Sequence, residues 1–251
     1  MISLRLLVAG LLVGGALMAQ SVSPVIVEYK NVSKGAASGK LELTNNTQVP
    51  LDVVIEAKSF NITSEGRSQY RDLDPSIHLQ LSNSSTRLQP GQSYYVFYKV
   101  KADSIPAWFT IYSGFSPPKH NVDGEHADVN MRVMLPHVVY LYQKTKLTKP
   151  DIKIKDVTYV TSTHKVVCDL ENVSVNLGRV QKVTANGEHS EAQSGGFPLL
   201  PGIPRHLEMD WTATTLPKKV AIAFENFTIT MPIETITEGT QNVEPTSEKN
   251  Q

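Results

Sequence analysis

Apolar residues recur at every second position along most of the chain, in short runs separated by turn-forming residues. Val25, Val27 and Tyr29 alternate with other residues, and Leu41 and Leu43 do the same. Successive side chains of a β-strand point to opposite faces, so this alternation predicts strands with one buried face. Further runs rich in β-branched and aromatic residues, which are typical of strands, extend over residues 53–57, 94–100, 108–112 and 127–142.

Turn signals separate these runs, and a second series of strand patterns follows the first. Gly, Pro, Asn and Ser gather in residues 33–35, 45–46, 89–92 and 116–118. The second series covers residues 152–154, 166–170, 207–211, 220–224 and 227–233. The polar segment 144–150 between the series is typical of a linker. No long amphipathic helix pattern appears after residue 19, so we predict an all-β fold with two β-sandwich domains in tandem, residues 20–145 and 146–236.

The two ends of the chain differ in composition from the rest. One arginine, an apolar run over residues 6–19 and small residues at Ala16 and Ala19 predict a secretory signal peptide, residues 1–19, cleaved near Ala19. The alternative is an uncleaved membrane anchor, but the run is shorter than the roughly 20 residues that a bilayer span needs. The polar tail, residues 237–251, is predicted to be disordered. We therefore expect an exported protein.

Composition and motifs narrow the class of function. The 251 residues carry a formal net charge of zero, whereas a nucleic-acid binder usually presents a basic face, so we predict no nucleic-acid partner. Cys168 is the only cysteine and lies in an apolar run, which predicts a core residue and excludes an intrachain disulfide. The chain has no nucleophile elbow, phosphate loop or dinucleotide-binding glycine pattern, so we predict that it is not an enzyme.

One short segment gathers residue types that can ligate a transition metal: His120, Asp123, Glu125 and His126. Their spacing matches no standard metal motif, and Asp-Gly is typical of a turn. We therefore interpret the segment as a loop and predict no metal and no cofactor. The alternative is a metal-dependent enzyme that uses His120 and His126.

Several segments stand in an order that points to a known family. Leu-Glu-Leu-Thr-Asn-Asn-Thr at residues 41–47 and Leu-Gln-Pro-Gly-Gln-Ser at residues 88–93 are followed by a long strand pattern that ends at residues 140–142. Leu-Pro-Gly at residues 200–202, with Arg205 and Leu207 after it, echoes the second of these segments. In this order the chain, over residues 24–234, resembles the periplasmic chaperones of pilus assembly.

The resemblance implies an L-shaped pair of immunoglobulin-like domains that works in the periplasm. Such a chaperone binds a pilus-type subunit whose fold lacks its last strand, donates a strand of its own first domain, and delivers the subunit to an outer-membrane usher. Here the donor strand would contain Val129, Met131, Val133 and Leu135, which share one strand face. No cofactor is needed, and self-association in the free state would shield the strand.

Two alternatives stand beside this interpretation. The same four residues would face the core of their own domain if the strand is not donated, because an edge strand buries one side in any case. At the level of function, the alternative is a secreted structural or adhesive β-sandwich protein of the cell surface.

The chain also departs from the family in the cleft between the domains. The family holds the subunit's C-terminal carboxylate with an arginine on the first strand and a lysine on the donor strand, and the latter position is not basic here. The nearest cations, and hence the candidate carboxylate anchors, are Lys30, Arg132 and His137. Pro136 is expected to interrupt the donor strand or to create a bulge. These departures indicate a divergent member.

Overall fold

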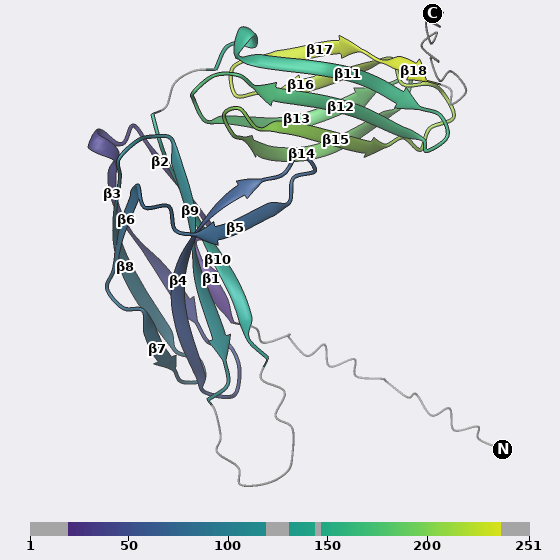
Figure 1. Ribbon diagram of the computed structural model, residues 1–251. Helices are drawn as coiled ribbons and strands as arrows, with labels where there is room; N and C mark the ends of the chain where they lie inside the picture. The colour runs from purple at the N-terminus through teal and green to yellow at the C-terminus, as the bar shows by residue number, and fades with distance from the viewer. Residues whose placement is uncertain (1–19, 119–130, 144–146, 237–251) are drawn as a thin grey trace, which may run out of the picture.

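The computed structural model describes residues 20–118, 131–143 and 147–236. These residues form two β-sandwiches, and the second lies across one end of the first, which gives the pair an L shape (Figure 1). The described part contains only β-strands and two short 3-10 helices, η1 (Ser33–Gly35) and η2 (Lys149–Asp151). None of its helices is long and apolar enough to cross a membrane. The predicted all-β class is confirmed.

The first sandwich packs a four-stranded sheet on a six-stranded sheet. The smaller sheet has the order β1 (Ser21–Ser23), β3 (Ala36–Thr44), β8 (Ser93–Ala102) and β6 (Ile77–Leu81). The larger has the order β2 (Ile26–Lys30), β10 (Val133–Tyr142), β9 (Ala107–Ser116), β4 (Leu51–Ile62) and β5 (Ser68–Asp72), and β7 (Ser85–Leu88) pairs with β4. Apolar residues at alternate strand positions are buried between the two sheets and form the core, among them Leu41, Leu43, Val96, Phe109 and Ile111.

The second sandwich has two four-stranded sheets. One has the order β15 (Pro204–Asp210), β12 (Lys165–Asn172), β11 (Ile152–Val160) and β18 (Glu234–Ile236). The other has the order β14 (Glu191–Leu199), β13 (Gly178–Asn186), β16 (Lys219–Ala223) and β17 (Thr228–Pro232). Cys168 lies in the core between them, and burial raises the pKa of its thiol to about 12. Its predicted core role is confirmed, and the raised pKa disfavours a thiolate nucleophile.

The same structural feature occurs once in each sandwich: a fully buried asparagine at the end of a strand is hydrogen-bonded to a Pro-Gly turn. The side chains of Asn45 and Asn172 each donate to two backbone carbonyl oxygens. The turn glycines donate back to the carbonyl oxygens of the same residues, Gly91 to Asn45 over 2.8 Å and Gly202 to Asn172 over 2.7 Å. The short Leu-Pro-Gly echo in the sequence therefore corresponds to a repeated structural unit.

The strand β10 runs unbroken through Pro136, contrary to the expected interruption. Its pairing with β9 keeps a constant register from Val133 to Leu141. On its other side β10 pairs, in parallel, with β2 only from Val138 to Tyr142. Pro136 precedes that segment and lies where no described strand covers the edge of β10. A residue without a backbone N–H is tolerated at such an edge, so neither a break nor a bulge is needed.

Candidate functional site

The first half of β10 is an open edge of the six-stranded sheet. The strand β9 pairs with β10 almost throughout, whereas β2 pairs with it only from Val138 onward. Residues 133–136 therefore have no strand on their second side within the described part of the chain. Val25 and Ile26, both exposed, lie beside β10 where the open segment ends. An edge of this kind carries backbone N–H and C=O groups that can pair with another chain.

The predicted donor residues lie at the start of this edge, except for Val129, which is outside the described residues. Met131 is 68% exposed. Val133 is half-buried, and Leu135 packs against the core of the first sandwich. Both lie on the same strand face as the fully buried Val139, so their side chains point toward the core of the first sandwich, at its edge. Their role as donor residues stays a prediction.

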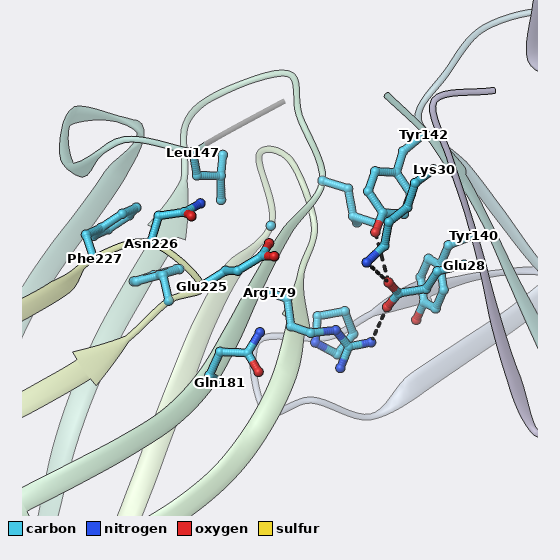
Figure 2. A pocket seen from close by; sticks show the side chains of 14 residues that line it. Glu28, Lys30, Tyr140, Tyr142, Leu147, Arg179, Gln181, Glu225, Asn226 and Phe227 are labelled. Carbon is cyan, nitrogen blue, oxygen red and sulfur yellow. Dashed lines mark hydrogen bonds and ion pairs between the residues drawn. The ribbon is translucent and has the colours of Figure 1, made fainter. Parts of the chain in front are cut away.

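A cleft of about 420 Å³ opens between the two sandwiches. The first sandwich contributes Glu28 and Lys30 from β2 and Tyr140 and Tyr142 from β10 (Figure 2). The second sandwich contributes Arg179 from β13 together with several apolar side chains. Lys30 and Arg179 thus bring positive charges from both sandwiches to Glu28, and Glu225 of the second sandwich adds a further carboxylate to the lining.

Both oxygens of the Glu28 carboxylate are engaged. Oε1 accepts a hydrogen bond from Arg179 over 2.8 Å. Oε2 accepts one from the Tyr142 hydroxyl over 2.9 Å and lies 3.4 Å from Nζ of Lys30. Burial alone would raise the pKa of Glu28, but the hydrogen bonds from Tyr142 and Arg179 and the nearby positive charges outweigh burial and lower this pKa. Glu28 is therefore ionised at neutral pH and joins β2 to β13.

Of the three candidate carboxylate anchors, Lys30 lies in the cleft. His137 does not, because its side chain is fully buried in the first sandwich. Its Nδ1 donates to the carbonyl oxygen of Pro24 over 2.5 Å, and its Nε2 lies 3.1 Å from the Tyr98 hydroxyl. Burial lowers the pKa of His137, which favours the neutral ring. The prediction that His137 anchors a carboxylate is therefore wrong, and the residue is a hydrogen-bonded core histidine.

Arg132 also lies away from the cleft. Tyr142 is the residue of β10 that pairs with Lys30, and Arg132 precedes it by ten positions, which corresponds to about 30 Å of strand. The guanidinium of Arg132 packs over the backbone of Gly114 on β9. Arg132 thus covers the far end of the sheet and cannot share a ligand with Lys30.

Arg179, the second cation of the cleft, was not predicted from the sequence. It lies on a strand of the second sandwich and meets Glu28 across a separation of 151 residues. The alternation of apolar residues predicts strands, and the family pattern predicts the order of motifs. Neither predicts which side chains of the two domains come into contact. Its ion pair with Glu28 could be found only once the two sandwiches were placed.

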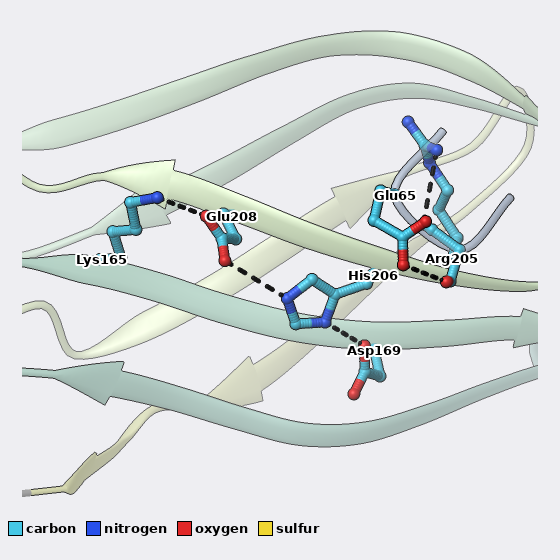
Figure 3. Close-up of polar contacts among 7 residues, drawn as sticks. Glu65, Lys165, Asp169, Arg205, His206 and Glu208 are labelled. Carbon is cyan, nitrogen blue, oxygen red and sulfur yellow. Dashed lines mark hydrogen bonds and ion pairs between the residues drawn. The ribbon is translucent and has the colours of Figure 1, made fainter. Parts of the chain in front are cut away.

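A hairpin of the first sandwich makes a further contact with the second. The turn between β4 and β5 reaches β15, where the carbonyl oxygen of Ser64 accepts a hydrogen bond from the backbone N–H of His206 over 2.8 Å. The Arg205 guanidinium lies against Gly66 of this turn. The negative charge of the neighbouring Glu65 stabilises the charged form of Arg205 (Figure 3). The hairpin thus supports the second sandwich at a site distinct from the Glu28 contact.

An apolar cluster also joins the two sandwiches. Phe60 and Tyr140 of the first sandwich pack with Leu200 of the second, and all three are buried. The rings of Phe60 and Tyr140 meet edge to face at 6.3 Å, a favourable aromatic geometry. The two sandwiches therefore meet through a buried apolar cluster as well as through polar contacts.

The candidate metal ligands of the sequence are not placed by the structure. His120 and His126 lie outside the described residues, as do the predicted signal peptide and the predicted disordered tail. Among the residues that are described, no group of three or more His, Cys, Asp or Glu side chains could hold a metal ion.

Comparison with known proteins finds likeness in structure only. No protein-family model matches the chain, and no curated protein matches it in sequence. A chain from a chaperone–tip adhesin complex of CFA/I fimbriae biogenesis is 11% identical at a TM-score of 0.52, over 86% of this chain and 98% of that chain. The class 5 fimbriae chaperone CfaA is 12% identical at a TM-score of 0.52, over 87% and 100%.

A third similar structure comes from Salmonella enterica. It is a chain from the complex of the SafA pilin with the SafB chaperone, 11% identical at a TM-score of 0.53, over 86% of this chain and 97% of that chain. These matches span both sandwiches, so the chain shares the two-domain fold of these fimbrial chaperones. At such low identity they show a shared fold.

Proposed function

We propose that the protein is a periplasmic chaperone that binds pilus-type subunits and completes their β-sandwich with the first half of β10, for pilus or surface-fibre assembly. The observation that carries the proposal is the open edge at residues 133–136, which begins beside the exposed Met131. The fold shared with fimbrial chaperones supports it.

The chemistry of an incomplete subunit matches what this edge offers. A sandwich that lacks one strand leaves backbone groups without partners and apolar side chains exposed to water. The open side of β10 supplies backbone partners, while Met131 and the exposed parts of Val133 and Leu135 supply apolar surface. Full burial of one such side chain contributes about 1.5–3 kcal/mol before the cost of ordering. Binding of this kind needs no cofactor.

The proposal includes two further partners. An outer-membrane usher would receive the subunit and incorporate it into the fibre. In the absence of a subunit, the same edge is available to a second copy of the chain, and self-association would shield its unpaired backbone groups.

Capture of a subunit tests the proposal directly. The chain is co-expressed in the periplasm with pilin-like chains encoded beside it, and complexes are recovered by affinity purification. Met131→Asp and Val133→Asp place a charge on the proposed contact and are expected to lower recovery at least about tenfold, because an unpaired charge is costly to bury. Phe97→Asp and Val175→Asp are controls at apolar positions outside β10, 57% and 78% exposed, and should leave recovery unchanged.

Two results would count against the chaperone role. One is recovery of no complex with any neighbouring pilin-like chain. The other is equal recovery for the two β10 variants and the two controls. Thermal unfolding of each purified variant distinguishes a lost contact from a lost fold.

A further inference from the structure

The cleft between the sandwiches contains a complete set of donors for one carboxylate. Lys30 comes from β2, Tyr142 from β10 and Arg179 from β13, and all three converge on one point (Figure 2). An ammonium, a hydroxyl and a guanidinium at hydrogen-bonding distance are the groups that proteins use to bind carboxylates. The carboxylate at this point belongs to the chain itself, since it is the side chain of Glu28.

The tether gives Glu28 an advantage over any free carboxylate. A side chain fixed to β2 is present at a high effective concentration, whereas a carboxylate from another molecule also loses translational freedom on binding. Both Glu28 oxygens already accept hydrogen bonds, one from Arg179 and one from Tyr142. A second carboxylate placed beside Glu28 would meet a like charge in a partly desolvated site.

We infer that Glu28 occupies the cation site of the cleft as an internal carboxylate, and that the protein therefore excludes the C-terminal carboxylate of another chain from this site. This inference rests on the proposed function and refines it. A subunit would be selected by its pairing with the open edge of β10 and not by the charge at its chain end. Glu28 also links β2 to β13, so displacing it would release a contact between the two sandwiches.

The inference is tested on the isolated protein with a peptide pair. The probes are acetyl-Thr-Val-Thr-Phe with a free C-terminal carboxylate and the same peptide as a C-terminal amide. Binding is measured at neutral pH by following the Arg179 side-chain and cleft backbone signals in NMR spectra of the labelled protein. The variants are Glu28→Gln, which keeps the shape but removes the charge, and the double variant Glu28→Gln with Arg179→Gln.

The wild-type protein is expected to show no preference between the two peptides. Glu28→Gln should bind the acid about tenfold more tightly than the amide, because Lys30 and Arg179 then face an uncharged side chain. The double variant should lose most of that preference. Glu28→Ala, which opens the site further, should show the same preference as Glu28→Gln and guards against a specific effect of the glutamine.

Two outcomes would overturn the inference: preferential binding of the acid by the wild-type protein at the strength of Glu28→Gln, or no preference in either Glu28 variant. Neither outcome depends on a subunit. If the subunit-capture experiment fails while the peptide preference appears as expected, the proposed function is wrong and the internal carboxylate stands. If capture succeeds and the preference is absent, only the inference about Glu28 falls.

Discussion

The corner that recurs in both sandwiches gives a quantitative prediction. In the first sandwich the Asn45 side chain donates to the carbonyl oxygens of Val49 and Leu88 over 2.8 and 3.1 Å, and accepts from the backbone N–H of Thr47 over 2.9 Å. Leu88 is fully buried, so water cannot replace the lost donor there. Asn45→Ala therefore leaves one buried carbonyl oxygen without this partner and removes the other hydrogen bonds of the Asn45 side chain.

The expected cost follows from these bonds. A buried acceptor that loses its donor costs about 1–3 kcal/mol, and each partly exposed hydrogen bond adds about 0.5–1.5 kcal/mol. Water replaces part of the exposed bonds, so we expect Asn45→Ala to lower the free energy of unfolding of the first sandwich by about 2–4 kcal/mol. Asn172→Ala should have a similar effect on the second sandwich, because Asn172 makes the corresponding bonds.

Urea unfolding followed at single residues by NMR separates the two sandwiches. Each variant should shift the transition of its own sandwich more than that of the other. Asn61→Ala, at an exposed position of β4, is the control and should change the unfolding free energy by less than about 0.5 kcal/mol. A cost below about 1 kcal/mol for both buried asparagines would refute the reasoning that these corners hold the sandwiches together.

Three further predictions concern the contacts of the second sandwich. The pKa of Glu28 lies below its ordinary value of 4.5, so the ionised Glu28 stabilises the contact between the domains fully above pH 4.5. This stabilisation is lost as the pH falls through the lower pKa of the folded protein. Small-angle scattering should therefore show a pH-dependent change in the arrangement of the two domains in the wild type and not in Glu28→Gln. The hydrogen bond to Asp169 raises the pKa of His206 above 6.5, so this pair stabilises the fold below that pH and loses its effect as the pH rises through the folded pKa; an NMR titration should give a lower midpoint in Asp169→Asn, and an equal midpoint would contradict it. Gly66→Ala should cost more stability than Gly91→Ala, because both have positive φ but only at Gly66 would a Cβ collide with the guanidinium that packs there; equal melting temperatures would contradict this.

The strand content and the core were predictable because they depend on local alternation. Leu41 and Leu43 are fully buried between the sheets as their spacing predicts, and Cys168 lies in the second core. The two Pro-Gly turns were visible as short echoes, although the buried asparagines that hold them were not. A polar residue in a strand pattern gives no sign of burial until its backbone partners are known.

The residues of the cleft were harder to predict, because they depend on the placement of the two sandwiches. Lys30 was predicted from its position in the first strand pattern of the sequence, which forms β2, but Arg179 belongs to the other sandwich. His137 can carry a positive charge and was therefore considered as an anchor for a carboxylate. Its two hydrogen bonds hold it in the core of the first sandwich, away from the cleft. Pro136 is compatible with an unbroken β10 because β2 pairs only with the second half of that strand. The register between two strands cannot be predicted from the local sequence of either one.

Amide hydrogen exchange of β10, measured with and without a purified pilin-like subunit, tests the central claim most directly. The N–H of Val138 is directed to the side of β2, so the N–H of Met134 is directed to the open side of the same strand, whereas those of Val133 and Leu135 face β9. If the first half of β10 pairs with the subunit, the Met134 amide should exchange markedly more slowly in the complex. The amides of β6, at the edge of the opposite sheet, should be unchanged. A stable complex in which the β10 amides keep their free exchange rates, while another edge becomes protected, would contradict the account.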